Sequence, residues 1–101
     1  MERTAKPLAN PAAICSRIFD GEAVLVNMDT AASIALNHTG FAVWQKVDGR
    51  STVEQIIAAV RREFPDAPAN VAEDVIALLE ELAAEGFIGF EWNTVNAERL
   101  P

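Results

Sequence analysis

Apolar and polar residues alternate along the first third of the chain with the two-residue period of β-strands. The alternation predicts strands over residues 14–19 and 23–27. Asp20-Gly21-Glu22 lies between them as a turn signal, so the two strands are expected to form a hairpin. A short loop then leads to a third predicted strand, Ser33–Leu36. This part of the chain therefore predicts a small antiparallel sheet.

The apolar period changes to that of a helix at Asn37, whose side chain can cap a helix by accepting a backbone N–H. Phe41 and Trp44 lie three residues apart, as on one face of a helix of about three turns. The Asp48-Gly49 pair predicts the end of this helix, because glycine tolerates the left-handed conformation that follows a helix.

A second helix is predicted from residue 51, because Ser51-Thr52-Val53-Glu54 matches a capping box. In this interpretation Ser51 is the cap and the Glu54 side chain reaches back to it. The apolar residues that follow have helical spacing: Val53, Ile56, Ile57, Val60 and Phe64. Pro65-Asp66-Ala67-Pro68 ends the helix and begins a turn.

A third helix is predicted over residues 69–85, closed by Gly86, and it carries two adjoining apolar stripes. The first stripe is Val71, Val75, Leu78 and Leu82, and the second is Ala72, Ile76, Leu79 and Ala83. Together they cover roughly 160° of the helix surface, more than the ~100° that a helix lying on a core requires. Either the helix is simply well buried, or one stripe faces the core while the other lines a groove.

The segments at the two ends have weaker patterns. Residues 1–13 contain two prolines and no period, which predicts a flexible N-terminal arm. Residues 87–92 suit either a short strand or a hydrophobic clasp after the helix, and residues 93–101 form a polar C-terminal tail. The domain proper then spans residues 14–92. Its three-stranded antiparallel sheet followed by three helices predicts an α+β, winged-helix-like fold.

The charge distribution argues against two classes of partner. The net charge is −7, and no Lys or Arg occurs between Glu63 and Glu98. In a DNA-binding winged helix the third helix enters the major groove, but here that helix carries five acids and no base. We therefore expect neither nucleic acid nor a membrane surface as a partner. No stretch approaches the ~20 apolar residues that span a bilayer.

The sequence offers little material for catalysis. Cys15 is the single thiol and His38 the single histidine, whereas a structural zinc site usually needs four nitrogen or sulfur ligands. Neither a glycine-rich phosphate loop nor a dinucleotide fingerprint is present. We therefore expect a non-enzymatic protein without metal or cofactor. The lone cysteine fits the reducing cytoplasm.

The third predicted strand is the better candidate for a binding site. An open sheet edge can accept an extended peptide through main-chain hydrogen bonds, and the small side chains of Ser33 and Ala35 would let a guest approach. The alternative is an edge that the protein merely tolerates or protects, as most small sheets do.

Two groups of short motifs resemble the PqqD family. Leu36-Asn37-His38-Thr39-Gly40, Trp44 and Val47-Asp48-Gly49 are similar to its "LN-x-T-(A/G)…W…(L/V)DG" core. Asp74-Val75, Leu78-Leu79, Leu82 and Gly86-Phe87-Ile88 are similar to its "DV…FL..L...G(L/F)(L/I)" ending. The resemblance covers about residues 14–88. Leu78 departs from it, because the family often has an aromatic residue there.

The resemblance implies a function. PqqD-like domains bind the leader of a ribosomally made precursor peptide and deliver it to a radical S-adenosylmethionine enzyme or another modifying enzyme. The leader is expected to add as a strand beside the third strand and to pack against the third helix, which would give its second stripe a use. The implied contact residues are Ser33, Ile34, Ala35 and Leu36 on the strand, and Val71, Val75, Ile76, Leu79 and Leu82 on the helix.

Other interpretations stay open at this point. The chain can instead be an interaction module that binds no leader, or an acidic winged-helix regulator. Asn37, Trp44, Asp48 and Gly49 can serve the fold alone, through capping, core packing and a turn. Asp74 can pair with Arg50 or another base, or face a partner enzyme.

Overall fold

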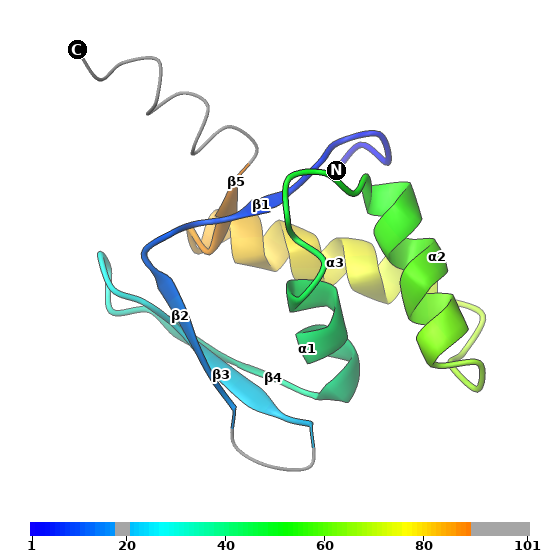
Figure 1. The fold of residues 1–101 in the computed structure, drawn as a ribbon, viewed down its shortest axis with the longest axis horizontal. Coiled ribbons are helices and arrows are strands. Elements are labelled where there is room, and N and C mark those ends of the chain that lie inside the picture. The colour runs from blue at the N-terminus through cyan, green and yellow to red at the C-terminus, as the bar shows by residue number, and fades with distance from the viewer. Residues whose placement is uncertain (18–20, 90–101) are drawn as a thin grey trace.

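A computed structural model describes residues 1–17 and 21–89. In it, β2 (Ala13–Arg17), β3 (Ala23–Asn27) and β4 (Ser33–Leu36) form an antiparallel sheet in the order β2-β3-β4 (Figure 1). β3 and β4 have the predicted bounds, and β2 begins one residue before the predicted strand. The last residues of that predicted strand, 18–19, lie outside the described residues.

The first helix is held at its start by the predicted cap. α1 (His38–Trp44) follows Asn37, whose Oδ1 accepts the Gly40 N–H at 2.8 Å. At seven residues α1 has about two turns, so it is shorter than expected. The chain leaves the helix through a turn and reaches Asp48, whose Oδ1 accepts the backbone N–H groups of Arg50 and Ser51 at 2.8 and 2.9 Å.

The second helix, α2 (Val53–Glu63), begins with a capping box that lies one residue later than predicted. The cap is Thr52, whose hydroxyl accepts the Gln55 N–H at 3.1 Å, while Gln55 Oε1 accepts the Thr52 N–H at 2.8 Å. Ser51 belongs instead to the preceding turn, because its own N–H is bound by Asp48. The assignment of Ser51 and Glu54 to the box is therefore corrected.

The third helix, α3 (Val71–Ala84), lies within the predicted range of residues 69–85. It starts two residues later than predicted, because Val71 N donates to Pro68 O and closes a turn before the helix. Gly86, with φ of +79°, follows its end as expected for a glycine that adopts the left-handed conformation.

The N-terminal segment departs from the expected flexible arm. β1 (Leu8–Ala9) pairs antiparallel with β5 (Ile88–Gly89), beside the end of α3 (Figure 1). The Ala9 N–H also donates to Val47 O, and the Asn10 N–H to Phe87 O, both at 2.9 Å. β5 is the described part of the strand that was one of two alternatives for residues 87–92, and residues 90–92 lie outside the described residues.

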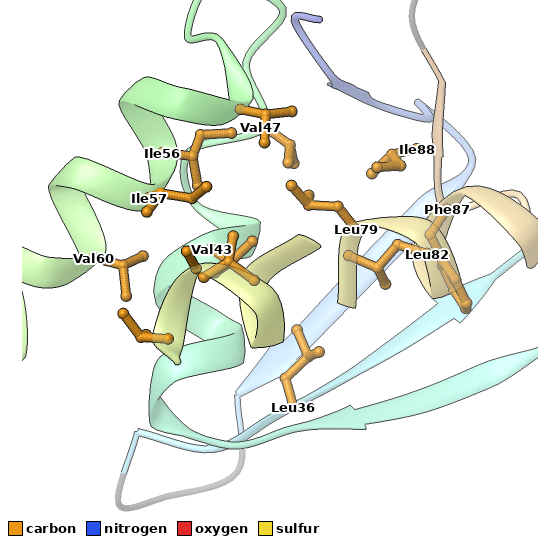
Figure 2. Packing of buried hydrophobic residues seen from close by; sticks show 14 of the residues in the cluster. Leu36, Val43, Val47, Ile56, Ile57, Val60, Leu79, Leu82, Phe87 and Ile88 are labelled. Carbon is orange, nitrogen blue, oxygen red and sulfur yellow. The ribbon is translucent and has the colours of Figure 1, made fainter. Parts of the chain in front are cut away.

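The core lies where the three helices meet the inner face of the sheet (Figure 2). Leu36 at the end of β4 is buried there, with Leu79 and Leu82 from α3 and Phe87 after it. Burying each such side chain contributes about 1.5–3 kcal/mol to stability. The predicted α+β class, a three-stranded antiparallel sheet followed by three helices, is confirmed.

Candidate functional site

An open groove of about 880 Å³ lies between the end of β4 and α3. The sheet side supplies Ala35 and Leu36 of β4, together with residues 22–23 at the start of β3. Residues of α1 and the loop between α2 and α3, residues 64–68, also line it. This is the place where the third strand and the third helix were expected to form a binding site.

The β4 wall presents a free sheet edge. β4 pairs with β3 on one side, and no strand among residues 1–17 and 21–89 pairs with the other. Ala35 is exposed and small, whereas Leu36 is 3% exposed and anchors the strand in the core. Alternate backbone N–H and C=O groups along such an edge are available to an added strand.

The α3 wall is formed by one face of the helix. Val71, Asp74, Val75 and Leu78 line the groove and have the spacing i, i+3, i+4 and i+7. The two valines are 4% and 2% exposed and belong to the core as well, while Leu78 is only partly buried. Leu78 is therefore the apolar side chain of α3 that a guest in the groove can contact most fully.

The groove lies on the first apolar stripe of α3, not on the second. Ile76 and Ala83 of the second stripe are partly buried and pack against the core, as do Met1 and Ala5 of the N-terminal segment. Leu79, also of the second stripe, is completely buried. The contacts expected on Ile76 and Leu79 therefore stay a prediction, since the groove lies along the other stripe.

Carboxylates surround the groove without matching cations. Glu22, Glu63, Asp66 and Asp74 line it, and no Lys or Arg is among the lining residues in the part of the chain that the structure describes. Glu63 is neutralised by Lys46, whose Nζ lies 2.8 Å from Glu63 Oε1. Among the described residues the other three carboxylates form no ion pair, and Asp74 therefore does not pair with Arg50.

The family model described as coenzyme PQQ synthesis protein D (PqqD) matches residues 22–88, which include β3, β4, all three helices and the first residue of β5. The chain belongs to the PqqD family. The match contains both walls of the groove.

Similar proteins agree with this assignment. Relatives named PqqA binding protein from Pseudomonas aeruginosa strains UCBPP-PA14 and PAO1 are each 38% identical over 55 residues. The aligned part covers 54% of this chain and 59% of each relative. A solved structure, TbiB1 in complex with the TbiA(beta) leader peptide, has a TM-score of 0.67 and 23% identity over 80% of this chain and 93% of that one. It shows the same fold.

The groove of this PqqD-family chain brings together part of the predicted site. Ala35, Leu36, Val71 and Val75 line it. The remaining predicted contact residues do not: Ser33, Ile34, Ile76, Leu79 and Leu82. Leu79 and Leu82 are 0% exposed, so they support α3 from inside the core.

Other lining residues were not predicted as contacts. Leu78 was placed on the first stripe and in the family-like ending but not among the contacts, and Phe64 was noted only as the last apolar residue of a helix. Residues 65–68 gave a turn signal, which says nothing about the surface that the turn borders. Their contribution depends on how α2 and α3 pack, which no local pattern specifies.

The motif residues of the PqqD core serve the fold in this structure. Asn37 caps α1, Trp44 packs partly buried against the core, and Gly49 adopts φ of +77° in the turn before α2. The hydrogen bonds from the backbone N–H groups of Ser51 and Arg50 lower the pKa of Asp48, because they stabilise its charged form.

Among residues 1–17 and 21–89, no cluster of three or more His, Cys, Asp or Glu side chains suited to a metal ion occurs. Within the same residues, no helix has the length and apolar character needed to cross a membrane.

Proposed function

We propose that this chain binds the leader region of a ribosomally made precursor peptide and presents it to a modifying enzyme, of the radical S-adenosylmethionine class. The leader adds as a strand to the free edge of β4 and packs on the Val71–Leu78 face of α3. The observation that carries the proposal is the unpaired β4 edge beside an apolar groove. The role is binding without catalysis, and we place it in the cytoplasm, where precursor peptides are made.

The comparisons support this function in two ways. Relatives in the PqqD family are named for binding PqqA, and the structural neighbour was solved with a leader peptide. Main-chain pairing along β4 gives affinity that tolerates sequence variation, whereas the groove chooses side chains. A domain that holds a peptide and docks on its enzyme raises the local concentration of substrate.

The test is a titration of labelled PqqA peptide from Pseudomonas aeruginosa into the full chain, followed by fluorescence anisotropy. Leu78→Asp places a charge on the groove face and is expected to weaken binding at least about tenfold, roughly 1.4 kcal/mol. Ala77→Asp is the matched control, because Ala77 is exposed on the same helix and does not line the groove.

The two variants separate the possible results. Loss of binding in Leu78→Asp with nearly unchanged binding in Ala77→Asp supports the groove. Equal binding by both variants and the wild type would reject it. Circular dichroism of each variant shows whether the fold is retained.

A further inference from the structure

Asp74 occupies an unusual place on the groove face of α3. It lies between Val71 and Val75 in sequence and one turn before Leu78, within an otherwise apolar line. Asp74 is exposed, and among the described residues its carboxylate has no cationic partner. A guest that covered this face would remove water from the carboxylate, which costs free energy unless the guest supplies a counter-charge.

Other carboxylates around Asp74 strengthen the need for a positively charged guest. Glu22 and Asp66 also line the groove without an ion pair in the described structure, and Lys46 already neutralises Glu63. The groove therefore presents a net negative potential next to the apolar side chains of Leu78 and Phe64. An acidic or neutral peptide leaves these carboxylates uncompensated, whereas a basic peptide compensates them.

We infer that the groove selects extended peptides in which a Lys or Arg stands two residues from a large apolar side chain. This inference rests on the proposed function. The cation faces the Asp74 carboxylate, and the apolar side chain packs on Leu78. The occupant to which we commit is a peptide strand, not the surface of a folded enzyme.

The spacing follows from helix and strand geometry. Asp74 and Leu78 are four residues apart, which is about 6 Å along a helix that rises 1.5 Å per residue. Side chains i and i+2 of an extended strand point the same way and lie about 6.7 Å apart. In Figure 1 β4 and α3 lie along similar lines, with their chains running in opposite directions, so a strand added to β4 runs along α3. The two spacings then coincide.

An alternative explanation for Asp74 is stabilisation of the helix. Acids in the first turn of a helix interact favourably with its dipole, and both Glu73 and Asp74 stand there. Glu73, however, is exposed and does not line the groove. Glu73→Gln therefore removes the same charge from the same turn and is a matched control for Asp74→Asn.

The experiment is selection of a displayed library of random 12-residue peptides on the wild type, Asp74→Asn and Glu73→Gln. The wild type and Glu73→Gln are expected to enrich peptides with Lys or Arg two positions from a large apolar residue. Asp74→Asn is expected to keep the apolar preference and lose the basic one. Thermal unfolding of all three proteins shows whether they are equally folded.

A titration then measures the size of the effect. One peptide selected on the wild type is compared with its counterpart in which the basic residue is Gln. We expect the basic peptide to bind the wild type about threefold to tenfold more tightly, and both to bind Asp74→Asn alike. The preference should decline as salt is raised, because dissolved ions screen the attraction between the peptide's cation and the Asp74 carboxylate, which is exposed in the free protein.

The outcomes distinguish this inference from the proposed function. If no peptides are enriched on the wild type, the proposed function fails and this inference with it. If peptides are enriched without basic residues, or if Asp74→Asn keeps the basic preference, this inference is overturned while peptide binding stands. If Glu73→Gln loses the preference as fully as Asp74→Asn, the assignment to the groove carboxylate is wrong.

Discussion

Single residues hold the turn between α1 and α2. Asp48 accepts two backbone N–H groups there, and Gly49 has φ of +77°, with space next to it limited by Leu8. Leu8 also forms a bridge with Asp48, so this turn fixes the N-terminal segment as well as the start of α2. A motif that the sequence suggested as a helix stop and a turn therefore joins three parts of the chain.

The Asp48 carboxylate gives a prediction for stability and its pH dependence. Asp48→Ala removes the oxygen that accepts both hydrogen bonds and is expected to cost about 1 kcal/mol, while Asp48→Asn keeps an oxygen acceptor and costs less. Because folding lowers the pKa of Asp48, its charged form stabilises the fold above the ordinary pKa of about 4.

Urea unfolding at several pH values checks both parts. The advantage of the wild type over Asp48→Asn should be constant between about pH 5 and 7 and should disappear as pH falls below about 4. If the wild type instead became more stable relative to Asp48→Asn as the pH fell, the pKa of Asp48 could not be lowered by folding.

Among whole elements, α2 gives the sharpest contrast between sequence and structure. Two neighbouring hydroxyl residues, Ser51 and Thr52, both suit a cap, and the structure uses the second. Thr52→Ala is expected to destabilise the protein by about 1 kcal/mol, because it removes the acceptor for the Gln55 N–H. Ser51→Ala, the matched control, is expected to change stability by a few tenths of a kcal/mol.

Thermal and urea unfolding of the two variants measure this difference. If Ser51→Ala lost more stability than Thr52→Ala, the cap of α2 would be Ser51, as the sequence predicted. Because neither residue lines the groove, peptide affinity should be unaffected in both variants.

The helices and strands that the sequence predicted are those whose own residues carry a recognisable pattern. β3 and β4 alternate, α1 has its cap, and α2 and α3 have helical spacing, so each could be located from its own residues. The face of α3 that lines the groove could not be predicted, because both stripes are apolar. That choice depends on Met1 and Ala5 packing on one side of the core and the loop after Phe64 bordering the other.

At the scale of the whole molecule, two buried asparagines join distant segments. Asn10 and Asn27 are 8% and 2% exposed, and both donate from Nδ2 to Gly86 O, at 2.9 and 3.2 Å. One comes from the N-terminal segment and the other from the end of β3. These hydrogen bonds connect the N-terminal segment and the end of β3 to the end of α3, and residues in the first half of α3 line the groove.

This arrangement predicts that residues 8–10 are part of the stable fold. Asn10→Ala is expected to lower the free energy of unfolding by about 1–3 kcal/mol, because it removes the bonds to Gly86 O and from the Ala12 N–H at a buried site. Pro11→Ala is the control, since Pro11 is exposed.

Native-state hydrogen exchange supplies the independent measurement. The amides of Ala9 and Asn10, which donate to Val47 O and Phe87 O, should be protected, whereas an arm that moves freely would exchange them at the rate of an unfolded chain.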